Sequence, residues 1–401
     1  MTSERIHFKG LNAVRFFAAS AVALSHASVV LMWHRLPNLI GWVNPQAGTL
    51  GWLNPETGKL AVICFFVLSG FLITYLLLSE EAQSGAISIR SFYLRRVLRI
   101  WPLYYLLVLS GFFLLPKIPL LDMPFVPTSA HPWRDCFLYM TIFPNLATPM
   151  PYLGHLWSIG VEEQFYILWP VLLVVFPNRL RLLLGIIVAY LGAFLAADLL
   201  LEPRAGSVTD VLRGALVFFR IDCIALGGVA AVVLFHRLQP ALRVLTSRAA
   251  QVGAPALLAI LYLWNVQVPK LTYELYAVVF AMMILNIAAH PESFRWLENH
   301  LLDTLGKVSY GIYMYHPLAI VLSLIGLRTL LGGERGGWLF SASVYGLGLA
   351  STVAIALVSY YGFELRFLRL KLRVSSVVSG DLAEEPSAPS DRYVIGAAFP
   401  K

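Results

Sequence analysis

The sequence predicts an all-α integral membrane protein, a bundle of about ten transmembrane helices with both termini in the cytoplasm. Of its 401 residues 58% are hydrophobic and 13% are charged, and the mean hydropathy of +0.72 lies outside the range of soluble domains. Several apolar runs reach the roughly 20 residues that a helix needs to cross a ~30 Å hydrocarbon core. Lys and Arg gather in alternate connections, which indicates their side of the membrane.

The apolar runs follow one another from residue 11 to residue 362, and we expect one membrane domain over 1–370. Residues 371–401 are rich in Ser, Pro, Glu and Asp, which is typical of a disordered tail. The run Leu11–Trp33 is interrupted by Arg15, so it is expected to be a retained span and not a signal peptide. The ten predicted spans are 11–33, 60–78, 100–116, 155–176, 182–201, 213–235, 251–268, 272–289, 307–331 and 338–362.

The basic residues set the expected orientation and the expected partners. An even number of spans puts both termini on one side, and the basic connections after even-numbered spans place that side in the cytoplasm. We expect a multi-pass protein of the cell inner (plasma) membrane, with membrane lipid around it. The formal net charge of +8 follows from this distribution, and no nucleic-acid partner is expected. Three cysteines without ligand spacing give no reason to expect a metal.

The stretch from His155 to Pro170 carries a histidine, two adjacent carboxylates and an amide inside an apolar segment. Ionisable groups at membrane depth cost roughly 2.5–3.5 kcal/mol each, so they usually face a protein interior and mark function. On an α-helix His155 and Glu162 share a face, whereas Glu163 points about 100° away. Neither carboxylate has a cation within one turn, and Arg220 is the obvious candidate partner for one of them.

Counting residues from the ends of the spans places six polar side chains in one layer. His26 of the first span and Glu162 of the fourth reach a similar height, so we expect them to meet. Taken singly, each of the six also has a structural interpretation: a histidine can be a packing residue, Ser69 a helix-packing position, and Arg220 and Asp222 can neutralise each other. The layer consists of His26, Ser69, Glu162, Arg220, Asp222 and His316.

Arg96 and Arg99 lie one helical turn apart where the third span begins. They can anchor the helix and attract anionic lipid. They can also form a phosphate clamp, because guanidinium groups bind phosphate through two parallel hydrogen bonds. Arg15, at a similar depth, would reinforce such a clamp.

Five motifs occur in an order that resembles the membrane acyltransferase type-three family. They are Arg15 followed by His26, the segment 65–73 around Ser69, the segment 93–100 with Arg96 and Arg99, the segment 155–166, and Gly306–Pro317 with His316. The resemblance covers about residues 7–370. It departs from the family at Glu364-Leu365-Arg366, where a Glu-Arg-Pro turn is common, which leaves the end of the last helix undetermined.

The resemblance implies an enzyme, an O-acyltransferase that moves an acyl group, most often acetyl, from cytoplasmic acyl-coenzyme A to a sugar hydroxyl. The acceptor would be an exported polysaccharide, a lipid-linked glycan or a glycosylated small molecule. Acyl-coenzyme A would be a co-substrate, with no permanently bound cofactor. No hydrolase-like domain follows the last span, so we expect the bundle to complete the reaction. The residues carried over from the family are Arg15, His26, Arg96, Arg99 and Glu162; the expected substrate-binding or supporting residues are Ser69, His155, Trp157, Ser158, Gln164, Tyr166, Arg220, Asp222 and His316.

Transfer to an alcohol needs a base and a group that stabilises the charge that develops. We expect His26 to be the base and Glu162, with Glu163 beside it, to be the carboxylate that orients and stabilises the imidazolium. Direct transfer and a covalent acyl-His26 intermediate both remain open. The competing classes are a transporter or flippase that uses the buried His, Glu and Arg as a relay, and a non-catalytic membrane scaffold.

Overall fold

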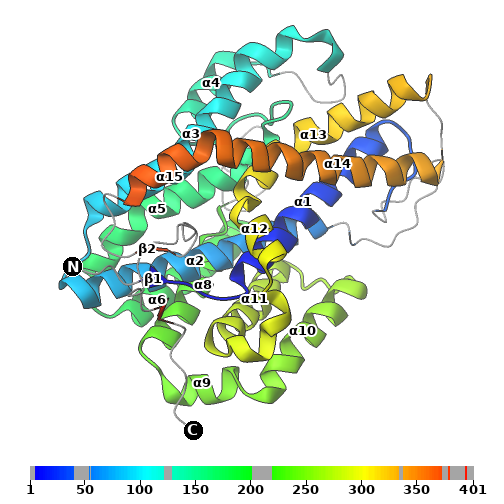
Figure 1. Cartoon of the computed structure of the whole chain (residues 1–401). Coiled ribbons are helices and arrows are strands. Elements are labelled where there is room, and N and C mark those ends of the chain that lie inside the picture. The colour runs from blue at the N-terminus through cyan, green and yellow to red at the C-terminus, as the bar shows by residue number, and fades with distance from the viewer. Residues whose placement is uncertain are drawn as a thin grey trace.

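The computed structural model describes residues 5–39, 54, 56–121, 129–200, 219–333, 337–372, 378–379 and 393–394. These residues fold almost entirely into helices (Figure 1). The long helices are α1 (Leu11–Trp33), α2 (Thr57–Ser84), α3 (Ile89–Leu109), α5 (Trp157–Val175), α6 (Arg179–Leu200), α8 (Ile221–Phe235), α10 (Arg248–Leu263), α11 (Thr272–Ala289), α13 (Ser309–Leu330) and α14 (Trp338–Ser359). The shorter helices are α4 (Pro132–Met140), α9 (Gln239–Leu245), α12 (His300–Lys307) and α15 (Leu365–Leu372).

The predicted all-α membrane fold is confirmed by these helices. Within the described residues, 8 helices are long and apolar enough to cross a membrane, and the count reaches 9 if α8 and α9, bent by 114°, form one span. Helix α10 is apolar but short. The number ten and the cytoplasmic side of the termini therefore stay predictions.

Two helices differ from the predicted spans at their ends. Helix α3 begins at Ile89, so the arginines expected in a connection belong to the helix itself. Helix α14 continues through a π-helical turn, Tyr360–Glu364, into α15. Without a proline after Glu364 the backbone keeps its donors, which allows the helix to continue.

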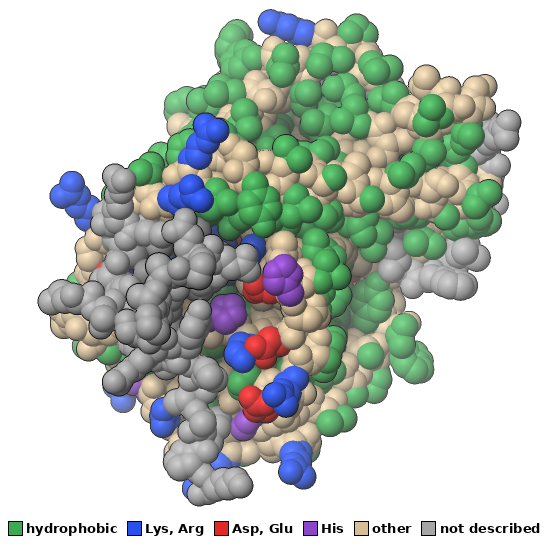
Figure 2. All heavy atoms as spheres, viewed as in Figure 1, with side chains coloured by type: hydrophobic (Ala, Val, Ile, Leu, Met, Phe, Trp, Pro, Cys, Tyr) green, Lys and Arg blue, Asp and Glu red, His purple; other side chains and the backbone are tan. Residues whose placement is uncertain are grey.

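The surface of the bundle is widely apolar, as expected for helices that face lipid. Leu330 and Leu339 are 83% and 84% exposed, and only 11% of the apolar stretch of helix α6 is buried inside the bundle. Figure 2 shows hydrophobic side chains spread over α3, α13 and α14, while charged side chains gather on another part of this face. Apolar exposure of this extent would be a liability in water and is stable in a bilayer.

Helix α2 runs through the core and packs closely against α8. Phe66 and Phe71 of α2 are fully buried. A Cβ added at Gly227 of α8 would collide with the backbone carbonyl of Val67, and one at Gly70 of α2 would collide with the carbonyl of Ile224. Small residues at this crossing allow the two backbones to touch, as is common between membrane helices.

The ends of the chain meet in a small parallel sheet. Strand β1 (Arg5–Ile6) lies between β2 (Val378–Ser379) and β3 (Tyr393–Val394). Of the tail predicted as disordered over 371–401, residues 371–372 end helix α15 and two residue pairs form β2 and β3. The other residues lie outside the described ones, and the prediction for them is untested.

Candidate active site

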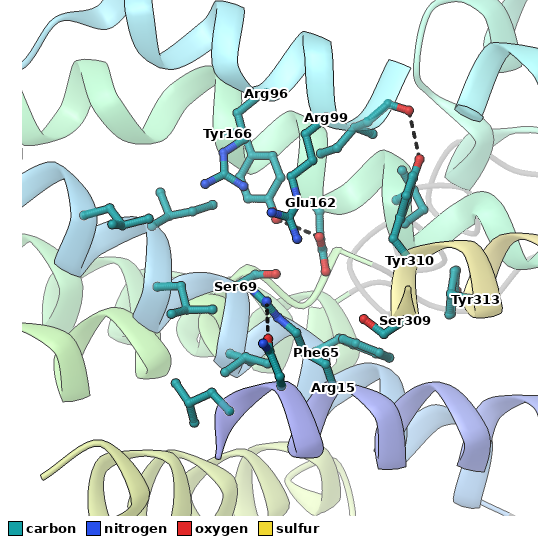
Figure 3. Close-up of a pocket in the computed structure, with 18 of the residues that line it drawn as sticks. Arg15, Phe65, Ser69, Arg96, Arg99, Glu162, Tyr166, Ser309, Tyr310 and Tyr313 are labelled. Atoms are coloured by element: carbon teal, nitrogen blue, oxygen red, sulfur yellow. Dashed lines mark hydrogen bonds between the residues drawn. The ribbon is translucent and has the colours of Figure 1, made fainter. Parts of the chain in front are cut away.

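A pocket of about 150 Å³ opens between helices α1, α2, α3, α5 and α13. Its wall is apolar along α2, apart from Ser69, whereas α1, α3, α5 and α13 contribute most of its polar and charged side chains. Figure 3 shows three arginines and a carboxylate pointing toward its centre from different helices. The polar lining includes Arg15, Ser69, Arg96, Arg99, Glu162 and Tyr166, all of which were site candidates from the sequence.

The arginines at the start of α3 divide into two groups. Arg95 forms an ion pair with Glu80 at 2.6 Å, whereas Arg96 and Arg99 line the pocket. The Arg96 guanidinium lies over the rings of Tyr166 and Phe92, at 5.2 and 5.5 Å, and its buried Nε has no hydrogen-bond partner among the described residues. A buried guanidinium with an unused donor is suited to bind an anion.

Arg15 is held in place by a chain of polar contacts that leads to helix α12. Its Nη1 donates to Asn12 Oδ1 at 3.0 Å, and Asn12 Nδ2 donates to Asp303 Oδ1 at 2.7 Å. Asp303 also pairs with Lys307 at 2.7 Å. Partial burial raises the pKa of Asp303, but the hydrogen bonds from Lys307 and Asn12 outweigh it and leave the pKa below its ordinary value. Helix α12 thus fixes the position of Arg15.

Glu162 stands on the pocket wall among these groups. Its Oε2 accepts a hydrogen bond from Tyr166 Oη, one turn along α5, at 2.7 Å (Figure 3). Arg15 and Arg96 are its cationic neighbours, and Ser69 lies beside it. Glu162 therefore serves as the counter-charge of the arginines of the pocket.

Glu163 is buried on the other side of α5. Its Oε2 accepts from Trp101 Nε1 at 2.9 Å, while Oε1 has no partner among the described residues. It does not line the pocket. The two adjacent carboxylates are thus turned apart, as the helical spacing predicts.

A pair of hydroxyl groups from α5 and α13 lines the pocket. Tyr313 Oη donates to the backbone carbonyl of His155 at 2.8 Å, and Ser158 Oγ lies 2.6 Å from Tyr313 Oη. Both residues line the pocket. Because the Tyr313 proton is engaged with a carbonyl, Ser158 is the donor in the second bond.

Behind this hydroxyl pair three histidines pack together. His26 Nδ1 and His316 Nε2 are 3.0 Å apart, and the ring centroids of His155 and His316 are separated by 4.9 Å. Neither ring nitrogen of the buried His155 has a hydrogen-bond partner among the described residues. His26 is half-buried, and His316 is fully buried.

The expected contact between His26 and Glu162 is wrong. In the described part of the chain, the His26 ring is hydrogen-bonded to the Val22 carbonyl, at 3.2 Å, and to His316, while Glu162 is bonded to Tyr166. The expected common face of His155 and Glu162 assumed one continuous α-helix. Residues 154–156 form a 3-10 turn, and α5 begins only at Trp157, so the angle counted for one continuous α-helix does not apply.

The six side chains expected in one layer do not gather at one place among the described residues, because a common height along the spans does not fix the direction around each helix. His26 and His316 form one group, and Ser69 and Glu162 face the pocket. Arg220 pairs with Glu274 of α11 at 2.7 Å, and Glu162 and Glu163 have other partners. Arg220 is also a charged neighbour of Asp222, in line with the alternative that these two neutralise each other. Asp222 is fully buried beside Cys223, whose Sγ is 3.8 Å from Oδ2.

Two further sequence candidates have structural contacts. Gln164 Nε2 donates to the Ile142 carbonyl and to Asn145 Oδ1, at 3.1 and 2.8 Å, so it holds the connection before α5. The Trp157 ring meets Phe66 edge to face at 6.2 Å. Within the described ranges no group of His, Cys, Asp and Glu side chains is arranged to hold a metal ion.

The sequence reasoning missed several residues of the pocket. His7, Asn12, Ser309, Tyr310 and Tyr313 all line it. Tyr313 could have been found, because it precedes His316 by three residues and so shares its face of α13. His7 lies before the first helix, and no periodicity points to it.

Comparison with known proteins assigns the family. The model of a family described as acyltransferase domain matches residues 8–361. The chain is 28% identical over 347 residues, 80% of its length and 50% of the relative's, to a putative peptidoglycan O-acetyltransferase, YrhL, of Bacillus subtilis. It is 29% identical over 292 residues, 66% of its length and 45% of the relative's, to the peptidoglycan O-acetyltransferase OatA of Listeria monocytogenes.

The chain therefore spans about half the length of these curated relatives. No solved structure matches it. The family match covers most of the chain and includes every residue of the pocket except two at the N-terminal end, Ile6 and His7. The chain belongs to the acyltransferase family that its five motifs resemble.

Proposed function

We propose that this protein is an O-acyltransferase that transfers an acyl group, most often acetyl, from acyl-coenzyme A to a sugar hydroxyl of a cell-envelope glycan. The observation that carries the proposal is the pocket, in which guanidinium groups from two helices converge on one space. Phosphate groups are the anions that such a set binds best. The names of the relatives support acetyl as the group and a glycan as the acceptor.

The donor would bind with its phosphates at Arg15, Arg96 and Arg99 and its thioester toward Ser158 and Tyr313. Arg96 offers an unused donor in a buried position, where a charge-assisted hydrogen bond is strongest. Tyr313 lies one turn beyond Ser309 on α13, so the hydroxyl pair is about 6 Å deeper than the start of that helix. His316 is about 4.5 Å further along. The thioester would thus be directed toward the histidines.

His26 would act as the base. The acceptor hydroxyl gives its proton to the imidazole while its oxygen bonds to the acyl carbon; the carbon–sulfur bond then breaks, and the proton passes to the thiolate of coenzyme A. A covalent acyl-His26 intermediate remains the alternative route. Glu162 is assigned to the arginines of the pocket, where it keeps Arg15 and Arg96 oriented before the donor binds.

The test is acyl transfer by the purified full chain in proteoliposomes, with labelled acetyl-coenzyme A and a panel of acceptors: peptidoglycan fragments, neutral polysaccharides and lipid-linked glycans. We expect an ester-linked label on one acceptor class. Label on no acceptor, together with movement of an acceptor or a proton across the bilayer, would replace the enzyme by the transporter or flippase. His26→Ala is the control for non-enzymatic transfer.

A further inference from the structure

The contacts of the histidine pair determine which nitrogen of each ring carries a proton. His316 Nδ1 lies 2.6 Å from the backbone carbonyl of Tyr313. A carbonyl oxygen can only accept a hydrogen bond, so His316 Nδ1 must be protonated. In a neutral imidazole the other nitrogen then has a lone pair. His316 Nε2 is therefore an acceptor.

The carbonyl of Tyr313 is free to take this bond because of the next residue in the chain. In an α-helix the N–H of residue 317 would donate to the carbonyl of residue 313. Residue 317 is a proline inside α13, and it has no N–H. The His-Pro sequence thus leaves one carbonyl vacant and places a donor ring beside it.

His26 Nδ1 is flanked by two acceptors. One is His316 Nε2 at 3.0 Å, and the other is the carbonyl of Val22 at 3.2 Å. Nδ1 of His26 therefore carries the proton, and its Nε2 has the lone pair. His155 packs against His316 without hydrogen-bonding to any described residue, so it does not compete for His316 Nε2.

The remaining nitrogen of His26 is the one placed to react. The His26 ring is half-buried. Its Nε2 has no hydrogen-bond partner among the described residues and is not among their fully buried polar atoms. This is the arrangement that a general base requires, with one nitrogen fixed by an acceptor and the other accessible with a lone pair.

We infer that His316 is the positioning residue of the reaction: through Nε2 it holds His26 in the Nδ1–H form, and it stabilises the imidazolium that forms when His26 Nε2 takes the hydroxyl proton. A neutral histidine thus takes the role that the sequence led us to expect of the Glu162 carboxylate, which is to orient and stabilise the His26 imidazolium. Pro317 supports this arrangement because it leaves the Tyr313 carbonyl free to accept the hydrogen bond from His316 Nδ1. The inference rests on the proposed function, since it specifies how His26 acts as the base.

The experiment compares four variants of the full chain in proteoliposomes: His26→Ala, His316→Gln, His316→Leu and Pro317→Ala. A Gln at 316 keeps an acceptor oxygen close to the position of Nε2, whereas Leu keeps volume and removes the acceptor. We expect His316→Leu to lower kcat by about 10²-fold or more, within the range of a disturbed general base, with the KM for acetyl-coenzyme A unchanged. His316→Gln should stay within about tenfold of the wild type, and Pro317→Ala should lose about tenfold because its N–H competes for the Tyr313 carbonyl.

The protonation state is measured directly by solid-state NMR of protein with labelled histidine, with the His26 signals assigned by their absence from His26→Ala. We expect the Nδ1–H form of His26 in the wild type. An Nε2–H form would overturn the inference, and this measurement does not require activity or a foldable His316→Leu. Equal rates for His316→Gln and His316→Leu would also overturn it.

A failure of the proposed function has a different signature. In that case the wild type transfers no acyl group, or His26→Ala transfers it at the wild-type rate, whatever tautomer the spectrum shows. Wild-type kcat in His316→Leu beside an inactive His26→Ala would leave the base in place and remove the positioning role.

Discussion

Replacing Arg96 by Gln should weaken the binding of acyl-coenzyme A far more than it slows the reaction at saturation. Arg96 lines the pocket, lies over the Tyr166 ring at 5.2 Å, and has an unused buried donor. A hydrogen bond to a charged group contributes about 1.5–3 kcal/mol, which corresponds to roughly a 10- to 150-fold rise in the KM for the donor. Because the phosphates lie far from the reacting carbon, ground state and transition state lose the same binding, and kcat should change little.

The neighbouring arginine provides a matched control. Arg95 pairs with the buried Glu80 at 2.6 Å and is not part of the pocket, so Arg95→Gln should lower the thermal midpoint and leave the donor KM unchanged. The assay is the initial rate of acetyl transfer over a range of acetyl-coenzyme A concentrations, with thermal unfolding recorded for both variants. An unchanged donor KM in Arg96→Gln, or an equal rise in both variants, would refute the assignment of the pocket to the donor.

Four other outcomes are expected. Glu162→Gln should lower kcat/KM for the donor by about tenfold or more because Arg15 and Arg96 lose the carboxylate that orients them. Glu163 is bonded to Trp101 outside the pocket, so Glu163→Gln should change mainly the thermal midpoint; a larger kinetic effect at Glu163 would contradict the structure. Gly227→Leu should destabilise the bundle by about 1–3 kcal/mol or more through overpacking against α2, and Gly253→Leu, with open space around it, should not. Arg220→Met should cost about 3–5 kcal/mol, because it leaves Glu274 buried without its partner, and the double variant with Glu274→Leu should recover part of this in thermal unfolding. Asp303→Asn should be less stable than the wild type at pH 7. Because the folded-state pKa of Asp303 lies below 3.8, this difference in stability should vanish only as the pH falls below that value, through the folded-state pKa. A constant difference in stability from pH 7 to pH 2 would contradict this.

Composition and the length of the apolar runs sufficed to predict an all-α membrane bundle, because a bilayer permits few other arrangements. The motifs led to Arg15, Arg96, Arg99, Glu162, Ser69 and Tyr166, which the structure gathers at one pocket. Arg15, Ser69, Glu162 and Tyr166 lie on predicted helices, which carry their side chains at known angles and heights, and Arg96 and Arg99 stand just before the predicted third span. The local part of the site was therefore accessible to sequence reasoning.

The pairing of side chains between helices was not accessible. The expected pair of His26 and Glu162 rested on height alone, whereas the rotation of α1 turns His26 toward α13 and His316. His155 lies in a 3-10 turn before α5, so its direction relative to Glu162 could not be counted from the period of an α-helix. The ion pair of Arg220 with Glu274 was missed for a similar reason, since Glu274 lies in a span where no motif had been noted.

We propose that one polypeptide couples the cleavage of acyl-coenzyme A to esterification of a sugar hydroxyl, with His26 as the base. The most direct measurement follows free coenzyme A thiol and sugar-bound acetyl ester together, in proteoliposomes that contain either the wild type or His26→Ala at equal protein level. Equal amounts of thiol and ester from the wild type, and neither above background from a folded His26→Ala, are the predicted result. Ester formation by His26→Ala at the wild-type rate, or thiol release by the wild type without ester on any glycan, would contradict it.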